Sequence, residues 1–311
     1  MVNLTSYNTL RVPAKARDLK ILKSLKDLEI LRADEPYMFL GLGANILFRQ
    51  DFPGTIIQVN LKGRKVVSEN DDEVIIEAAA GENWHEFVTW AVEHNYSGIE
   101  NLALIPGSVG AAIVGNIGAY GQEIKNTISN VQYLISNEQK TFNNAECEFG
   151  YRESFFKYHK EYLVISATFR LSKKFVLNDS YIKFPDNCNL RQAFDFIVST
   201  RQNKLPDWTK IGTAGSFFKN PVVTDSKIQD LRSKILDLKT FNNKVHAGKL
   251  LDVLGWKGKK IGNVATYDKS ALVIINLGGA TGQEIYDYAE AMREDIRKNF
   301  DIELEYEVRI I

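Results

Sequence analysis

The sequence feature that most restricts the fold is a run of very small residues between positions 105 and 121. This segment, IPGSVGAAIVGNIGAYG, contains five glycines, at 107, 110, 115, 118 and 121, and three alanines. Glycine disfavours helices and is depleted in strands, so the run is not expected to form a regular element for its own sake. One interpretation is a tight buried loop. The other is a wall against a large flat ligand, such as a pyrophosphate or a tricyclic ring, with backbone amides supplying the hydrogen bonds.

A second glycine-containing turn, LGLGANILF, occupies residues 40–48. Gly41 and Gly43 lie between apolar runs, and glycines without a Cβ let backbone N–H groups approach a phosphate closely. A simple turn between two strands explains the same pattern equally well. No third glycine opens a helix here and no acidic residue follows at the usual distance, so this is not a Rossmann fingerprint.

The regular elements are mixed along the chain. Short β-branched runs predict strands at residues 55–61, 73–80, 163–171 and 270–276. Capping residues predict helices that start after Asn83, Asn189 and Thr281, and the alternation in LEYEVRII predicts a last strand over 304–311. Strict βαβ alternation is missing, which favours an α+β fold. At 311 residues the chain is expected to form about two domains, with a boundary near residues 175–190.

Composition excludes several classes of function. Thirty-nine Lys and Arg balance thirty-nine Asp and Glu, so overall charge does not draw this protein to nucleic acid or anionic membrane. Only Cys147 and Cys188 occur, so neither a disulfide framework nor a CxxC-type metal site is expected. The chain has no run of 18 apolar residues and no apolar core of signal-peptide length at its start, so we expect no membrane insertion and a reducing cytoplasm.

A third group of candidates is dispersed through GYRESFFK, KLPDW and GTAGSFFKNP. Arg152, Lys204, Ser216 and Asn220 suit the binding of a polyanion, because Arg offers a planar fork and Lys a point charge. Each of them alone is also compatible with a surface charge or a structural hydroxyl. A serine nucleophile is not indicated, because no G-x-S-x-G motif is present and only four histidines could act as the base.

Taken in order, these segments resemble one family, the UDP-N-acetylenolpyruvoylglucosamine reductases, flavoenzymes that form UDP-N-acetylmuramate for bacterial cell walls. The resemblance runs from about residue 8 to 311, through GLGAN, AGENWHEFV, NIGAYG, CEFGYRESFFK, AGSFFKNP and LEYEVRII. NIGAYG, YRxSxFK and AGSFFKNP in that order are highly specific.

The resemblance implies a fold and a cofactor. Residues 1–188 would form an FAD-binding region of two α+β subdomains, about 1–60 and 61–188, of the vanillyl-alcohol-oxidase (PCMH) type. Residues 189–311 would form a C-terminal α+β substrate domain whose last strand, 304–311, returns to the flavin site. FAD would be bound non-covalently, by Gly41, Leu42, Gly43, Ala44, Asn45, Ile46, Pro106, Gly107, Ser108, Gly110, Ala111, Asn116, Gly118, Ala119 and Tyr120.

The resemblance also implies a catalytic set of Arg152, Ser216 and Glu307. NADPH would reduce FAD and leave, and UDP-N-acetylglucosamine-enolpyruvate would take its place in a ping-pong cycle. Hydride from the flavin would reach C3 of the enol ether. Arg152 and Glu307 would stabilise the enolate-like intermediate, and Ser216 would deliver a proton to C2.

Substrate binding is implied for three further residues. Lys204 and Asn220 match positions that bind the diphosphate of the substrate and of NADPH, and Tyr181 matches the tyrosine that covers the substrate in the long-loop class. Tyr181 could instead be an ordinary strand tyrosine. A monomer is expected. The chain departs from the family at Ile113, Gly115, Thr213, Tyr267 and Ser270, and the three implied catalytic residues are not among these positions.

Two alternatives remain. One is an FAD-dependent alcohol oxidase or dehydrogenase of the same fold. Such relatives often tether the flavin through a His or Cys, and residues 105–121 contain neither. The other is a non-catalytic binder of nucleotide sugars, in which the catalytic set would be dispensable.

Overall fold

The computed structural model describes residues 1–30 and 35–311 and divides into two compact units. The terminal unit consists of residues 1–17, 43–53 and 202–311, and the central unit of residues 18–42 and 54–201. Both units are therefore discontinuous in sequence. The expected FAD-binding region (1–188) and substrate domain (189–311) were defined by the ligands they would bind. Contacts within the chain do not test this division, so it stays a prediction.

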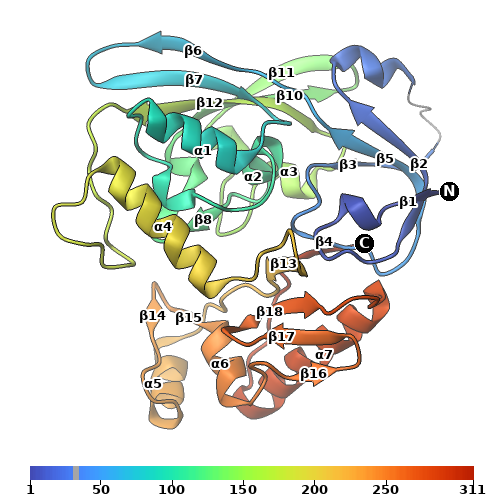
Figure 1. Cartoon of the computed structure of the whole chain (residues 1–311), viewed down its shortest axis with the longest axis vertical. Coiled ribbons are helices and arrows are strands. Elements are labelled where there is room, and N and C mark those ends of the chain that lie inside the picture. The colour runs from blue at the N-terminus through green and yellow to red at the C-terminus, as the bar shows by residue number, and fades with distance from the viewer. Residues whose placement is uncertain (31–34) are drawn as a thin grey trace. The chain divides into compact units, whose positions relative to one another are not determined.

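An antiparallel five-stranded sheet forms the frame of the central unit (Figure 1). Its strand order is β11-β10-β12-β7-β6. Along β7, Val74, Ile76 and Ala78 are buried and alternate with more exposed residues, as expected for a strand with one face in the core. The strands predicted at 73–80 and 163–171 are confirmed to within one residue. The strands are β6 (Arg64–Glu69), β7 (Glu73–Ala79), β10 (Ile128–Ile135), β11 (Glu138–Asn143) and β12 (Leu163–Ser172).

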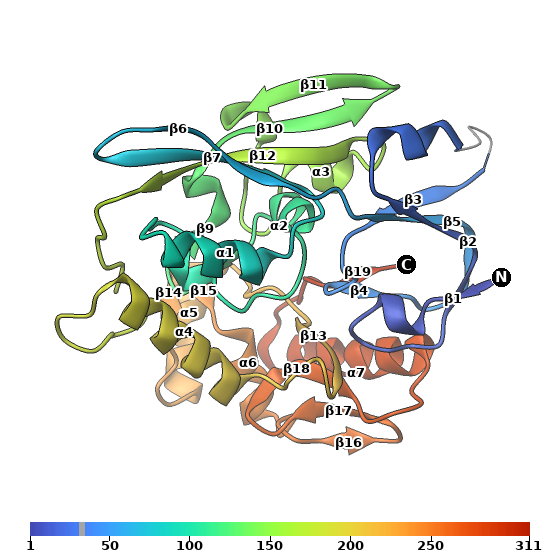
Figure 2. The same ribbon diagram turned by 45° about the horizontal axis from the view of Figure 1, so that its top comes forward.

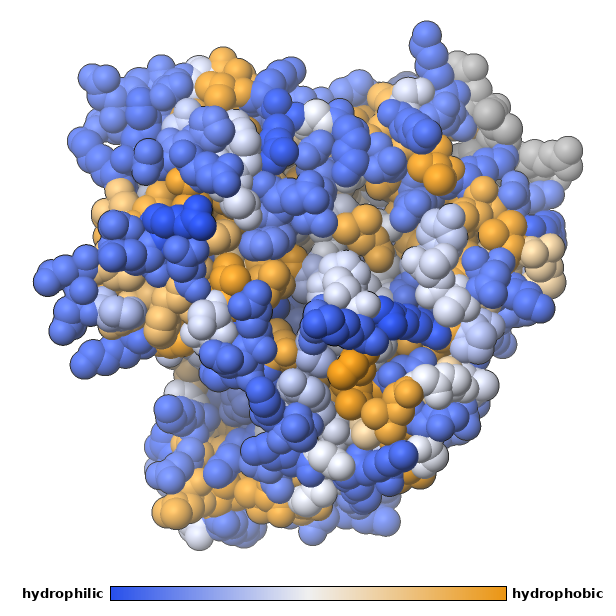
Figure 3. All heavy atoms as spheres, in the orientation of Figure 1, coloured by the Kyte–Doolittle hydropathy of each residue, from blue (hydrophilic) through white to orange (hydrophobic). Residues whose placement is uncertain are grey.

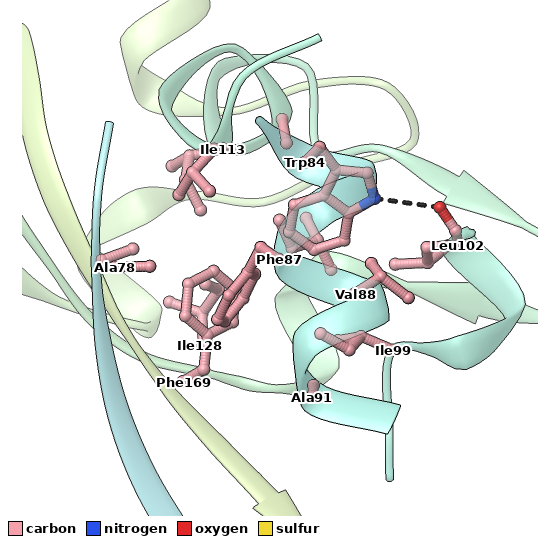
Figure 4. Packing of buried hydrophobic residues seen from close by; sticks show 14 of the residues in the cluster. Ala78, Trp84, Phe87, Val88, Ala91, Ile99, Leu102, Ile113, Ile128 and Phe169 are labelled. Atoms are coloured by element: carbon pink, nitrogen blue, oxygen red, sulfur yellow. Dashed lines mark hydrogen bonds between the residues drawn. The ribbon is translucent and has the colours of Figure 1, made fainter. Parts of the chain in front are cut away.

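Helices α1 (Trp84–Glu93) and α2 (Val109–Val114) lie on the same side of this sheet in both ribbon views (Figures 1 and 2). Figure 4 shows Trp84 and Phe87 of α1 packed against Phe169 of β12, with Phe87 and Phe169 ring centroids 4.9 Å apart. The indole Nε1 of Trp84 donates to the Leu102 carbonyl over 2.9 Å, so the ring is buried without losing a hydrogen bond. Burial of each such side chain contributes about 1.5–3 kcal/mol.

The predicted helix starts are confirmed in both units. The Asn83 side chain accepts from the Glu86 N–H at the start of α1. At α4 (Leu190–Lys204), Asn189 and Gln192 bond reciprocally. Thr281 and Glu284 form a capping box at α7 (Gly282–Phe300). These caps satisfy backbone donors that a helix N-terminus leaves open.

The central unit also contains shorter elements. In β3 and β5, which pair in parallel, Tyr37 stands opposite Thr55 and Leu40 opposite Gln58. The remaining elements are β2 (Lys15–Leu22), which begins in the terminal unit, β3 (Tyr37–Leu40), β5 (Phe52–Val59), whose first two residues belong to the terminal unit, β8 (Gly118–Ala119), β9 (Gln122–Glu123) and α3 (Phe155–Tyr158).

The terminal unit is built on a second antiparallel sheet, of order β13-β18-β17-β16. Helix α6 packs against β18, and α7 packs against β17 and β18. The predicted strand at 270–276 is confirmed as β18. The elements are β13 (Gly212–Ser216), α5 (Asp225–Lys234), β14 (Thr240–Phe241), β15 (Lys244–Val245), α6 (Ala247–Val253), β16 (Lys260–Ile261), β17 (Val264–Tyr267) and β18 (Ser270–Asn276).

The beginning of the chain completes the terminal unit. The Thr213 N–H donates to the Thr9 carbonyl over 2.9 Å, and Asn276 Nδ2 to the Leu10 carbonyl over 2.8 Å. β1 (Val2–Asn3) pairs with the first residues of β2. β4 (Ile46–Leu47) pairs in parallel with β19 (Arg309–Ile310). The last strand is therefore shorter than the predicted 304–311, and upstream of β19 Tyr306 forms an isolated bridge with Phe218.

Strands and helices are thus mixed within each unit, which confirms the predicted α+β class. On the face drawn in Figure 3, hydrophilic side chains cover most of the surface and apolar side chains gather in several separate groups. Across the described ranges 1–30 and 35–311, every helix is too short or too polar to cross a bilayer.

Candidate functional site

The two glycine-containing segments meet in the central unit. A Cβ added to Gly41 would lie 2.7 Å from Ser108 Oγ and 3.1 Å from Ala111 Cβ. Any larger residue at 41 would therefore push the first turn away from the start of α2. Two segments more than sixty residues apart in sequence form one local structure here.

Residues 106–111 are fixed by their own backbone. The Gly107 carbonyl accepts from the Trp84 N–H over 3.0 Å, and the Gly110 N–H donates to the Ala80 carbonyl over 2.8 Å. Gly107 has a φ of +138°, a backbone conformation that residues with a side chain rarely adopt. A Cβ added there would meet no atom within 4 Å. The segment is held rigidly while Gly107 borders open space.

Small residues also dominate the accessible part of this segment. Ala111 is exposed on a helix whose other residues Val109, Ala112 and Ile113 are buried, and Pro106 and Gly107 are half-buried. A surface of this kind offers backbone and methyl groups without bulky side chains. Such a surface suits a pyrophosphate or a flat tricyclic ring, the ligand types that the composition of the segment suggested.

Asn116 holds the next turn together. Its fully buried side chain donates from Nδ2 to the Gly150 carbonyl over 2.6 Å, and its Oδ1 accepts from the Lys125 N–H over 3.3 Å. Both side-chain groups thus bond within the protein, and one of them holds the backbone two residues before Arg152. The predicted contact of Asn116 with the cofactor stays a prediction.

Arg152 occupies a tight turn. Its φ of +60° lies in the left-handed region, which non-glycine residues enter mainly at strained or functional positions. Arg152 Nη2 donates to the Gly118 carbonyl over 2.7 Å, and the Arg152 carbonyl accepts from Lys157 Nζ over 2.7 Å. The half-buried guanidinium is therefore oriented by the NIGAYG turn, although the two motifs are separated in sequence.

Tyr120 and Tyr181 approach each other beside this turn, with ring centroids 6.3 Å apart at an edge-to-face angle. Asn101 links the backbone of Tyr120 to the segment that precedes Tyr181, since its Nδ2 donates to the carbonyls of Tyr120 (2.9 Å) and Asn178 (3.1 Å). Tyr181 is 51% exposed and lies in the irregular segment between β12 and α4. The alternative that it is an ordinary strand tyrosine is therefore wrong.

Ser216 and Glu307 are brought together within the terminal unit. Ser216 ends β13 opposite Val273, after an irregularity in the pairing that includes Gly215. The next residue, Phe217, donates its N–H to the Leu272 carbonyl over 2.9 Å and accepts from the Glu307 N–H over 3.0 Å. One residue therefore links the two predicted catalytic positions through the backbone.

Tyr306, the neighbour of Glu307, belongs to a charged network. Its hydroxyl donates to Glu290 Oε1, which also pairs with Arg293 Nη1 at 2.7 Å. Arg293 Nε donates to the Leu304 carbonyl over 2.9 Å. Burial, and then the hydrogen bond to Glu290, raise the pKa of Tyr306. The segment that carries Glu307 is thus tied to α7 by a charge-assisted network.

Lys204 and Asn220 are associated with the start of α6. The Ala247 N–H donates to Asn220 Oδ1 over 3.0 Å. Burial, followed by the positive charge of nearby Lys204, lowers the pKa of His246. Lys204 itself is exposed at the end of α4, so its amino group is open to an anionic ligand.

Sequence reasoning missed three residues that the structure associates with this site: His246, Tyr306 and Arg201. Arg201 carried a readable signal, because it follows Ile197 by four residues on the helix face that the apolar pattern marks as inward. Tyr306 and His246 gained their significance only from partners distant in sequence.

The predicted residues form one group in each unit. Arg152, Tyr120 and Tyr181 lie in the central unit with most of the predicted FAD residues. Ser216, Glu307, Lys204 and Asn220 lie in the terminal unit, together with Asn45, whose Nδ2 donates to the Glu307 carbonyl over 3.0 Å.

Comparisons with known proteins agree with these features. Residues 28–136 match an FAD binding domain, and residues 206–311 match the C-terminal domain of UDP-N-acetylenolpyruvoylglucosamine reductase. The chain is 40% identical to the UDP-N-acetylenolpyruvoylglucosamine reductase of Burkholderia lata and 39% to that of Burkholderia ambifaria, over 98% of this chain and 94% of each relative.

The fold has a solved counterpart in UDP-N-acetylenolpyruvylglucosamine reductase from Thermus caldophilus. The TM-score is 0.75 at 22% identity, over 99% of this chain and 97% of that one. Because the Burkholderia relatives match almost from end to end, we conclude that this chain belongs to the UDP-N-acetylenolpyruvoylglucosamine reductase family.

Proposed function

We propose that this protein is an FAD-dependent oxidoreductase that uses NADPH to reduce UDP-N-acetylglucosamine-enolpyruvate to UDP-N-acetylmuramate, a precursor of peptidoglycan. The observation that carries the proposal is the 40% identity over nearly the full length of named reductases. The small-residue surface around Gly107 supports it, because that surface fits a flat cofactor. We further propose that the protein acts as a cytoplasmic monomer.

The cofactor is proposed to lie against residues 41–46 and the predicted positions in 106–120. When bound, FAD would supply the two-electron chemistry that links NADPH to the enol ether. The chain contributes a rigid backbone surface, since the carbonyl of Gly107 and the N–H of Gly110 are already engaged. Without a His or Cys in this segment to form a tether, the binding is proposed to be non-covalent.

Arg152, Ser216 and Glu307 are proposed to carry out the second half of the reaction. As hydride reaches C3, negative charge spreads from C2 into the carboxylate. Arg152 would stabilise this charge with its guanidinium, and Glu307 through hydrogen bonding with the carboxylate. Ser216 would then give its hydroxyl proton to C2, a transfer that is favourable because the carbanion is a strong base.

Three further residues are proposed to hold the rest of the substrate. Lys204 supplies a solvent-accessible positive charge for the diphosphate, and Asn220 an amide beside it. Tyr181, exposed in its loop and next to Tyr120, is proposed to cover the bound substrate, as in the long-loop class.

Stopped-flow absorbance of the bound flavin tests the proposal. NADPH should bleach the flavin, and the enolpyruvyl nucleotide sugar should restore its colour under anaerobic conditions. Ser216→Ala should leave the first step nearly intact and slow the second about a thousandfold or more, because a proton donor is lost. The exposed Ser226→Ala is the matched control. Equal slowing of both steps would refute the role of Ser216.

The same samples decide between the alternatives. An alcohol oxidase would be reduced by an alcohol, and a covalent flavin would keep its yellow colour on acid-precipitated protein. A non-catalytic binder would bind the nucleotide sugar, and its reduced flavin would not be reoxidised by it.

A further inference from the structure

Arg201 occupies a helix position that the local pattern reserves for an apolar side chain. The buried residues of α4 are Leu190, Ala193, Phe194 and Ile197, which repeat at helical spacing. Arg201 follows Ile197 by four residues, so it continues this inward face in the last turn of the helix. A guanidinium thus stands where the core would otherwise continue.

The surroundings of Arg201 do not neutralise it. Its Nε is shielded from solvent and has no hydrogen-bond partner. Burial lowers the pKa of Arg201, the nearby Tyr120 phenol opposes this shift, and the positive charge of Arg152 adds to it. Within residues 1–30 and 35–311, no carboxylate forms an ion pair with Arg201.

Such an arrangement is unfavourable in the free protein. A shielded charge without a counter-ion destabilises a fold, and a second cation nearby adds repulsion. A guanidinium also has five donors in a planar fork, and the unpartnered Nε leaves part of that fork unused. Both deficits disappear when an anion with two oxygens enters beside Arg152 and Arg201.

We propose that Arg201 is a second anion-binding residue of the site, which together with Arg152 holds the carboxylate of the enolpyruvyl group. This inference rests on the proposed function and adds a residue that the sequence motifs did not supply. A carboxylate matches the planar fork of a guanidinium, because its two oxygens can accept two parallel N–H bonds. Two cations would also favour the further charge that the carboxylate gains during hydride transfer.

Arg201→Met in the flavin-loaded protein tests the proposal, because methionine keeps much of the length and removes the charge. Two probes separate the anion sources: the enolpyruvyl nucleotide sugar carries a carboxylate, whereas UDP-N-acetylglucosamine carries only the diphosphate. We expect Arg201→Met to weaken binding of the first about tenfold or more and of the second less than about twofold, as measured by perturbation of the flavin spectrum. Arg191→Met, an exposed arginine on the same helix paired with Asp195, is the control.

A second measurement does not depend on catalysis. The thermal midpoint of the substrate-free protein should be unchanged or higher in Arg201→Met, because an uncompensated charge is removed, whereas an arginine that stabilises the fold would lower it. The stabilisation that the substrate confers on the wild-type protein should shrink in the variant. Arg201→Lys retains the charge without the fork and should recover only part of the substrate affinity.

Each outcome leads to a decision. Equal weakening of both probes would place Arg201 at the diphosphate and overturn the carboxylate assignment. Loss of flavin alone would make it a cofactor contact, and unchanged binding in both the Met and Lys variants would refute the proposal outright. If the substrate fails to reoxidise even the wild-type flavin, the proposed function is wrong, and that result is distinct from any effect of Arg201.

Discussion

Two charged clusters, one in each unit, show opposite designs. Arg152 and Arg201 in the central unit place two cations near each other, and Arg201 has an unpartnered Nε. In the terminal unit, Arg293 is matched by Glu290 and Glu303 and holds the Leu304 carbonyl. The second cluster satisfies its own charges and stabilises the backbone next to Glu307. In the first cluster, Arg201 Nε has no hydrogen-bond partner, an arrangement that a ligand bringing a balancing anion would stabilise.

From this comparison we expect substitutions in the two clusters to affect different properties of the protein. Substitutions in the central cluster should reduce substrate turnover with little loss of stability. Substitutions in the terminal cluster should reduce stability, and turnover should change only as far as Glu307 moves.

The largest effect is expected for Arg152→Met. Loss of a cation that stabilises developing charge should slow reoxidation of the flavin by substrate about a hundredfold or more. Reduction by NADPH should change much less, and the thermal midpoint should stay within a few degrees. Stopped-flow kinetics and a melting curve measure these quantities. A large drop in the midpoint would show that Arg152 is structural and would end the contrast between the clusters.

Arg293→Met should have the next largest effect, on stability. It removes two ion pairs and the bond to the Leu304 carbonyl, and leaves Glu290 beside Tyr306 without the positive charge of Arg293. Because these groups are partly exposed, we expect a loss of about 1–2 kcal/mol in the free energy of unfolding, below the value for a fully buried pair. Urea denaturation measures it, with Arg297→Met on the exposed side of α7 as the control.

A double-mutant cycle on Tyr306→Phe and Glu290→Gln should give a smaller coupling, about 1 kcal/mol, because it isolates one hydrogen bond. The phenylalanine keeps the packing against Phe218, whose ring centroid lies 5.3 Å away. Reoxidation of the flavin should slow only a few-fold. Zero coupling would mean that packing alone holds the segment.

The smallest effect concerns His246. Burial and the charge of Lys204 lower its pKa, so the folded protein favours the neutral ring. The unfolded chain then binds more protons, and stability should fall as pH decreases from about 6.5 towards the lowered pKa. The difference in unfolding free energy between pH 7.5 and 5.5 should be smaller in His246→Gln than in the wild-type protein. An identical difference in both proteins would exclude His246 as a contributor.

Local features of the fold were readable from the sequence. The caps at Asn83, Asn189 and Thr281 depend on residues three positions apart, and all three helices begin where these pairs predict. The glycine-containing segments at 40–48 and 105–121 were predicted as turns or ligand surfaces, and the structure places Gly41 against Ser108 and leaves open space beside Gly107.

Features that depend on distant contacts were not readable. The pairing of residues 46–47 with 309–310 joins two very short strands whose partner no local pattern reveals. The bond of Tyr306 to Glu290 links a helix to an irregular segment, and the charges of Arg152 and Arg201 interact although the residues are distant in sequence. For the candidate site, sequence motifs therefore identified chemical types, and the contacts of the fold added the residues that support them.

The discontinuous terminal unit has a consequence for synthesis on the ribosome. Leu10 emerges 266 residues before Asn276, the side chain that binds its carbonyl. All of the central unit is translated in that interval and has time to fold. Residues 1–17 of the nascent chain meanwhile lack the contacts that residues 202–311 will provide. A chaperone that shields these early residues would protect the step at which assembly is most open to error.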